Sequence, residues 1–260
     1  MNRQRQVALV LSTGGARGIA HIGVIEELER QGYEITSIAG SSMGALIAAA
    51  YATGRLEACK EALFSLRRWS LFRWMDVTWL KGGFLKGDKL MRRIGEIIPD
   101  TCIEDLKLPY VAVATDLQTE REVVFRRGRL LDAVRASIAL PGVLQPFRSG
   151  DSVLIDGGLA CPLPLEHVAR QKDDLLVASV AYDLCVGDRL FRLKPSRYFF
   201  MSQPSTIAVQ TNIRHALARF SPDVVIRSQT RPYTIFQFDR AKELVELGRM
   251  AARKALKARS

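Results

Sequence analysis

The chain has 260 residues, enough for one large α/β domain with a full core or for two small domains. Its apolar content of 48% and charged content of 25% are typical of a globular protein, and no apolar stretch approaches the ~20 residues that span a bilayer. The formal net charge of +11 attracts anions without choosing among nucleic acid, phospholipid headgroups and acidic metabolites. No helix-turn-helix, zinc finger or ribonucleoprotein motif accompanies this charge, so we expect no nucleic-acid partner.

Four cysteines are scattered along the chain without any C-x-x-C pairing: Cys59, Cys102, Cys161 and Cys185. We therefore expect neither a disulfide framework nor a metal site, and reduced thiols in the cytoplasm. The apolar run at 7–11 follows a basic start but is too short for a secretory signal, and it predicts a first strand. No organic cofactor is implied, and the sequence predicts no oligomeric state.

Strand and helix patterns then alternate along the chain. Strands are predicted at 7–12, 35–39, 110–115, 122–125, 153–155 and 175–180, and helices at 19–30, 42–53, 130–139 and 239–257. This alternation predicts a mostly parallel central sheet flanked by helices, a three-layer α/β/α fold. Because no linker divides the chain, residues 1–260 are expected to form one domain, with a core at about 7–180 and a C-terminal helical region at about 190–260.

A glycine-rich turn follows the first predicted strand and directly precedes a helix. Such turns present unpaired backbone N–H groups at the positive end of the helix dipole. One interpretation is an oxyanion hole for acyl transfer; the other is a phosphate-binding loop. The stretch lacks both the Walker ending and the dinucleotide spacing, which favours the oxyanion hole. Its candidate residues are Gly14, Gly15, Ala16, Arg17 and Gly18.

The second predicted strand ends in Gly40-Ser41-Ser42-Met43-Gly44, just before an apolar helix. A G-x-S-x-G sequence at a strand-to-helix turn is typical of a nucleophile elbow, in which the central serine projects from a sharp bend. Small residues at Gly40 and Gly44 allow the strand and helix to approach closely. The motif predicts Ser42 as an activated nucleophile.

The base that activates this serine is not an obvious histidine. None of the three histidines, His21, His167 and His215, lies in a loop with turn residues; each falls in a stretch with a helical pattern. By contrast, Asp156-Gly157-Gly158 follows a predicted strand, where reactive groups of α/β sheets gather. A partly buried carboxylate there could take the proton of Ser42 directly. A plain turn is the alternative interpretation of this motif.

Taken together, the three motifs resemble the patatin-like phospholipase family, including its bacterial and neuropathy-target-esterase-like members. The likeness spans about residues 7–180 and includes further matches at 114–117 and 135–141. The resemblance implies a serine lipid acyl hydrolase of phospholipase A or lysophospholipase type, with Ser42 as nucleophile, Asp156 as base and an oxyanion loop around Gly14. One residue departs from the family pattern: Thr13 stands where the loop usually has its first glycine, and a β-branched residue resists positive φ.

All three tryptophans lie within 69–79, interleaved with arginine. This clustering favours a cap segment in peripheral contact with an anionic membrane surface, at the inner face of the membrane; packing of a lid onto the core is the alternative. Two rival functions also stand beside the hydrolase: a catalytically weak acyl-lipid-binding or regulatory relative, which Thr13 would explain, and a nucleic-acid-associated protein, supported by charge alone.

Overall fold

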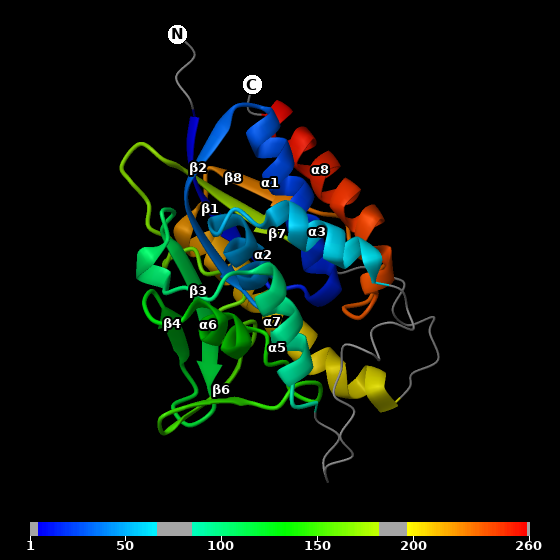
Figure 1. Cartoon of the computed structure of the whole chain (residues 1–260). Coiled ribbons are helices and arrows are strands. Elements are labelled where there is room, and N and C mark those ends of the chain that lie inside the picture. Colours follow the sequence, from blue (N-terminus) through cyan, green and yellow to red (C-terminus); the bar gives the residue numbers. More distant parts are fainter. Residues whose placement is uncertain (1–4, 67–84, 182–196, 259–260) are drawn as a thin grey trace.

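The computed structural model describes residues 5–66, 85–181 and 197–258, arranged around a central sheet (Figure 1). The sheet has eight strands in the order β5-β6-β3-β2-β1-β7-β8, with β4 paired to β3. The strands are β1 (Arg5–Leu11), β2 (Tyr33–Ser41), β3 (Tyr110–Asp116), β4 (Glu122–Phe125), β5 (Phe147–Ser149), β6 (Ser152–Asp156), β7 (Leu175–Val180) and β8 (Val224–Arg227). The pairs among β3, β2, β1, β7 and β8 are parallel, whereas β4 and β6 run antiparallel to β3 and β5 runs antiparallel to β6.

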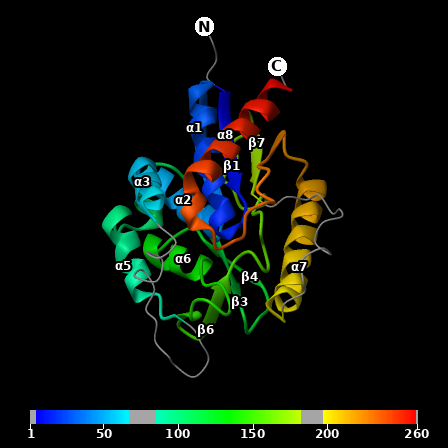
Figure 2. The same ribbon diagram turned by 90° about the vertical axis from the view of Figure 1, so that its right-hand side faces the viewer.

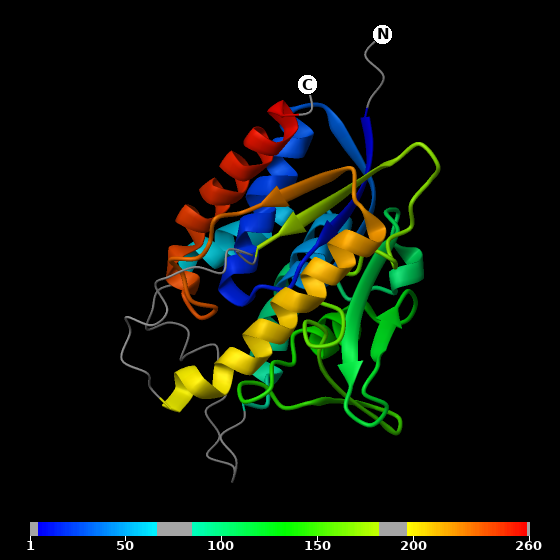
Figure 3. The same ribbon diagram turned by 180° about the vertical axis from the view of Figure 1, so that it is seen from behind.

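Helices cover both faces of this sheet, which confirms the predicted three-layer α/β/α fold. One face carries α1 (Ala20–Arg30), α2 (Met43–Ala52), α3 (Leu56–Ser65), α5 (Asp88–Ile97), α6 (Leu130–Ser137) and α8 (Ala241–Lys257). Helix α7 (Arg197–Phe220) lies on the opposite face, as the side and rear views show (Figures 2 and 3). Short 3-10 helices are η1 (Gly15–Ile19), η2 (Ile103–Asp105) and η4 (Phe238–Arg240).

The alternation of side chains along β1 builds the two halves of the core. Val7, Leu9 and Leu11 point to the α1 and α2 side, whereas Ala8 and Val10 point to the α7 side, and all five are fully buried. A strand buried on both faces reads as a continuous apolar run, as expected for a central parallel strand. The first predicted strand therefore lies near the middle of the sheet, and its carboxyl end points toward the candidate site.

Helices α1 and α8 pack against each other through two glycines. A side chain on Gly23 would lie 1.9 Å from the carbonyl oxygen of Val245, and one on Gly248 would lie 1.8 Å from that of Ala20. Both contacts are far shorter than any real Cβ contact, so glycine is required on each helix for the backbones to approach this closely. This contact fixes the C-terminal helix beside the N-terminal half of the chain.

Several elements differ from the sequence expectations. The C-terminal region, expected to be helical, contains α7 but also contributes β8 to the sheet, and no prediction covered α3 or α5. His167 lies in a turn rather than a helix. The tryptophan-rich stretch at 69–79 lies outside the described residues, so its membrane role stays a prediction. Among the described helices, none has the length and apolar character needed to cross a membrane.

Candidate active site

The predicted elbow forms a sharp turn between β2 and α2. Ser42 has φ 55° and ψ −123°, a strained conformation for a residue with a side chain, with a cost on the order of 1–3 kcal/mol. A Cβ on Gly40 would lie 2.4 Å from the carbonyl oxygen of Gly44, and one on Gly44 would lie 2.5 Å from that of Leu11. Both glycines are therefore needed so that β2, α2 and β1 can meet at the turn.

Asp156 reaches Ser42 by a route that the sequence did not predict. Asp156 was expected at the carboxyl edge of parallel strands, but β6 runs antiparallel to β3. Ser41 pairs with Val113 on β3, and the next residue of β3, Ala114, pairs with Asp156. Because β4 pairs with both Val113 and Ala114 along the opposite edge of β3, β6 takes over from β2 along the same edge, and the register places the aspartate next to the end of the strand that carries the serine turn.

Gly157 makes this approach sterically possible. A Cβ at this position would lie 2.0 Å from the carbonyl oxygen of Val113 and 2.8 Å from the hydroxyl of Ser41. Gly158 serves differently: its amide donates a hydrogen bond of 2.8 Å to Oδ1 of Asp156. The two glycines of the D-G-G turn thus let the aspartate approach the elbow and orient its carboxylate.

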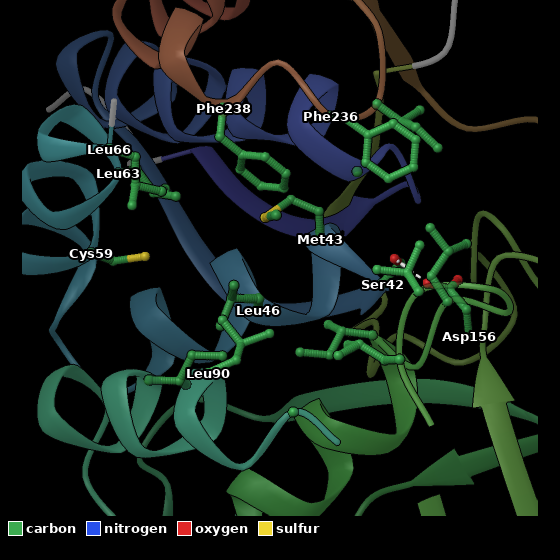
Figure 4. A pocket seen from close by; sticks show the side chains of 18 of the residues that line it. Ser42, Met43, Leu46, Cys59, Leu63, Leu66, Leu90, Asp156, Phe236 and Phe238 are labelled. Carbon is green, nitrogen blue, oxygen red and sulfur yellow. Dashed lines mark hydrogen bonds between the residues drawn. The ribbon is translucent and has the colours of Figure 1, made fainter. Parts of the chain in front are cut away.

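The hydroxyl of Ser42 donates a hydrogen bond of 2.5 Å to Oδ2 of Asp156 (Figure 4). Both side chains are buried. Burial raises the pKa of Asp156 to about 6, against the hydrogen bonds from Ser42 and Gly158, which lower it. The carboxylate is thus ionised at neutral pH, yet far more basic than an exposed aspartate, which suits it to accept a proton.

Ser137, at the end of α6, supports the strained turn, a role that the sequence analysis did not assign. Its hydroxyl accepts a hydrogen bond of 2.8 Å from the backbone N–H of Ser42 and donates one of 2.6 Å to the carbonyl of Val113. Ser137 therefore ties the turn at Ser42 to β3. Because its amide is engaged in this way, Ser42 has no backbone N–H left to offer to a substrate.

The glycine-rich loop offers fewer free donors than predicted. The amide of Ala16 donates to the carbonyl of Ile235 at 2.8 Å, and that of Arg17 donates to Gly14 at 3.1 Å. The expectation that these two amides face the oxyanion is therefore wrong in this geometry. Gly18 has a packing role instead, because a Cβ there would lie 2.7 Å from Cβ of Met43. Within the described part of the chain, the amides of Gly14 and Gly15 have no acceptor.

Thr13 does not strain the loop, although strain was expected from its β-branched side chain. Its φ is not positive, and its amide donates a hydrogen bond of 2.8 Å to the carbonyl of Pro162. The left-handed conformation falls instead on Gly15, at φ 53°. The departure from the family pattern therefore occurs at a position where an ordinary residue fits.

His21 anchors the residue before the same loop through hydrogen bonds, and it is not a base for Ser42. Its Nε2 lies 2.9 Å from the carbonyl oxygen of Ser12 and its Nδ1 lies 2.8 Å from the hydroxyl of Ser179. A carbonyl can only accept, so Nε2 carries the proton and Nδ1 accepts from Ser179. Burial lowers the pKa of His21 to about 4, which keeps the ring neutral in this role.

Ser42 and Asp156 lie at one end of a cavity of about 440 Å³ (Figure 4). The rest of its wall is almost entirely apolar, and Cys59, Leu63 and Leu66 lie at the end away from the serine. The full lining is Thr13, Gly15, Ser42, Met43, Leu46, Cys59, Ala62, Leu63, Leu66, Leu85, Gly87, Leu90, Ile94, Ile97, Ile98, Ile138, Leu140, Val143, Leu144, Asp156, Ile235, Phe236 and Phe238. A hydrogen-bonded serine at one end and an apolar wall beyond it match an acyl ester in shape and polarity.

The C-terminal region supplies one wall of this cavity, which the sequence analysis did not foresee. Ile235, Phe236 and Phe238 line it from the loop between β8 and α8. The same loop anchors the glycine-rich turn: Nε of Arg17 donates to the carbonyl of Tyr233 at 2.6 Å, beside the Ala16 bond to Ile235. These hydrogen bonds therefore hold the candidate oxyanion loop against the cavity wall formed by the loop between β8 and α8.

The sequence matches a family model described as patatin-like phospholipase over residues 9–169. The chain therefore belongs to the patatin-like phospholipase family. It is 44% identical, over 173 residues, to an uncharacterized NTE family protein of Mycobacterium tuberculosis, a match that covers 66% of this chain and 48% of that protein. It is 37% identical, over 181 residues, to lysophospholipase NTE1 of Cryptococcus neoformans, covering 68% of this chain and 11% of that protein.

The chain thus spans about half the length of the mycobacterial relatives and a small part of the fungal one. Among solved structures, VipD from Legionella pneumophila is similar with a TM-score of 0.49 and 14% identity, over 98% of this chain and 67% of that chain.

Proposed function

We propose that this chain is a serine lipid acyl hydrolase, an esterase of phospholipase A or lysophospholipase type. The observation that carries the proposal is the hydrogen bond of 2.5 Å between Ser42 and Asp156 at the polar end of an apolar cavity of about 440 Å³. Family membership and the name of the fungal relative, a lysophospholipase, support the same substrate class.

The proposed reaction has two steps. Oγ of Ser42 attacks the ester carbonyl while Asp156 takes its proton, and the amides of Gly14 and Gly15 stabilise the negative oxygen that develops. The proton then passes to the departing alcohol, which leaves an acyl-serine. In the second step Asp156 takes a proton from water, the resulting hydroxide attacks the acyl-serine, and the proton returns from Asp156 to Oγ of Ser42 as the fatty acid is released. The buried dyad provides both steps with one base and requires no histidine.

A fluorophosphonate probe and a series of acyl esters test this proposal. The wild-type chain should be labelled at Ser42 and should hydrolyse long-chain esters, whereas Ser42→Ala should lose both labelling and hydrolysis. Ser41→Ala is the matched control, because Ser41 is the neighbouring hydroxyl but is fully buried. Labelling that persists in Ser42→Ala, or a wild-type chain that neither reacts nor hydrolyses any ester, would contradict the proposal.

The far end of the cavity should set the acyl-chain length. Each methylene buried there contributes about 0.8 kcal/mol, or roughly fourfold in kcat/KM. We expect Leu63→Trp to shorten the cavity and to lower kcat/KM for the longest accepted ester at least about tenfold, with little change for short esters. The measurement is kcat/KM over the ester series. An equal loss for every chain length would place the acyl chain elsewhere.

A further inference from the structure

A cluster of four metal-ligating side chains lies outside the cavity and has no part in the proposed reaction. Glu122 comes from β4, Cys161 from the segment after the D-G-G turn, and Glu166 and His167 from the turn that follows. One ligand atom from each of these residues lies within 4.8 Å of all the others. No spacing pattern along the chain indicated such a site, because its ligands come from separate segments.

The charges of this cluster are unbalanced. Nε2 of His167 lies 2.8 Å from a carboxylate oxygen of Glu122 and 3.9 Å from one of Glu166. In the described part of the chain, the two glutamates make no ion pair other than these contacts to His167. The thiol of Cys161 is buried, and burial with the two nearby carboxylates raises its pKa. Two carboxylates thus face a single imidazole beside a buried, uncharged thiol, and a divalent cation would neutralise the carboxylates.

We propose that Glu122, Cys161, Glu166 and His167 form a binding site for a zinc-class divalent cation. Thiolate, imidazole and carboxylate together suit zinc in tetrahedral geometry, whereas magnesium and calcium prefer oxygen ligands alone. With bonds of about 2.0–2.3 Å, ligand atoms around tetrahedral zinc lie roughly 3.3–3.8 Å apart, so side-chain shifts of about 1 Å close the cluster. On binding, the thiol of Cys161 releases its proton to solvent, and the imidazole presents an unprotonated Nε2.

The site would be linked to the catalytic turn through the backbone. The amide of Cys161 donates a hydrogen bond of 2.9 Å to the carbonyl of Gly157, next to Asp156. A cation held by Cys161 and Glu122 would therefore tie β4 to the turn that carries the aspartate. The binding proposal is independent of the proposed hydrolysis, and its test does not use activity.

Zinc titration of the full chain, freed of metal with a chelator and followed by calorimetry, tests the site. We expect one Zn²⁺ per chain, and a loss of affinity of at least about 100-fold in Cys161→Ser and in His167→Gln. The matched controls are Cys102→Ser and His215→Gln, which remove the same side chains elsewhere. Failure of the wild-type chain to bind zinc, or equal affinity in site and control variants, would overturn the proposal.

Cobalt substitution gives a second readout that identifies the Cys161 thiolate as a ligand. Co²⁺ bound at the site should show thiolate-to-metal charge-transfer absorption, and Cys161→Ser should abolish it while Cys102→Ser keeps it. Because Cys161 is buried, its variant could fail to fold; Glu166→Gln changes an exposed residue and should still weaken binding. A cobalt complex without the thiolate band in the wild-type chain would contradict the site as proposed.

Discussion

Glu27 and Asp156 are both buried carboxylates, yet their surroundings make them opposite in character. Glu27, on α1, accepts hydrogen bonds from Arg30 and Gln31 at the end of the same helix and from Arg253 on α8. The guanidinium of Arg30 above all, with Arg253 and Gln31, holds the pKa of Glu27 well below its usual range despite burial. Within the described residues, the carboxylate of Asp156 accepts hydrogen bonds from the Ser42 hydroxyl and the Gly158 amide alone, and burial raises its pKa to about 6.

Burial alone does not make a carboxylate reactive. A buried carboxylate with cationic partners stays ionised and joins two helices, as Glu27 does for α1 and α8. When a buried carboxylate has only neutral hydrogen-bond donors, burial disfavours its charged form by more than the donors stabilise it, and its pKa rises. Among the residues that the structure describes, no cation donates a hydrogen bond to Asp156, and this suits its carboxylate to act as a base.

The largest expected effect is that of Asp156→Asn. The amide can still accept from Gly158 but cannot take the proton of Ser42, so we expect kcat to fall about 10⁴-fold. The same change removes a charge whose burial is unfavourable: a pKa of about 6, against 3.8 in the unfolded chain, corresponds to about 3 kcal/mol at neutral pH. The variant should therefore be inactive and more stable, as measured by ester hydrolysis and urea denaturation. Unchanged activity would exclude Asp156 as the base.

Glu27→Gln should have the opposite outcome. The substitution leaves two guanidinium groups without their carboxylate partner and should lower the free energy of unfolding by about 2 kcal/mol, or roughly 30-fold in the unfolding constant. Because Glu27 lies at the α1–α8 contact, kcat at a temperature well below unfolding should not change. Urea denaturation and ester kinetics on the same sample check both parts. A fall in kcat without loss of stability would mean that the two carboxylates are not separate in function.

The local parts of the site could be predicted from the sequence, because each one depends on a short pattern. A turn that must place Ser42 in a strained conformation needs glycines at Gly40 and Gly44, and a close approach to β3 needs Gly157. These requirements leave a spacing that can be recognised. The fold class followed for the same reason, because buried parallel strands produce continuous apolar runs.

Features that depend on distant segments could not be predicted in this way. The antiparallel direction of β6 depends on its pairing with β3, and the cavity wall at 235–238 depends on the packing of a loop that has no periodic pattern. The zinc-class cluster joins β4 to residues about 40 positions later and is visible only in three dimensions. Helix α5 is different: Leu90, Ile94 and Ile97 recur at helical spacing, a signal that could have found it.

The smallest effect, and the most direct test of the comparison, is the pH dependence. Because the Asp156 carboxylate must be ionised to act as base, kcat/KM should be level above its pKa of about 6 and fall about tenfold for each pH unit below it.

The free energy of unfolding should change with pH in the opposite direction. A folded pKa above the unfolded value means that the stability tied to the proton on Asp156 is present in full below about 3.8 and is lost as pH rises through about 6. The advantage of Asp156→Asn in urea should therefore vanish near pH 4. Glu27 has a lowered pKa, so its contribution is present above the unfolded value near 4.5 and is lost only in stronger acid. A wild-type profile whose activity and stability both fell between pH 7 and pH 5 would contradict this assignment, because a base that is buried without a cation must lose activity while the fold gains stability.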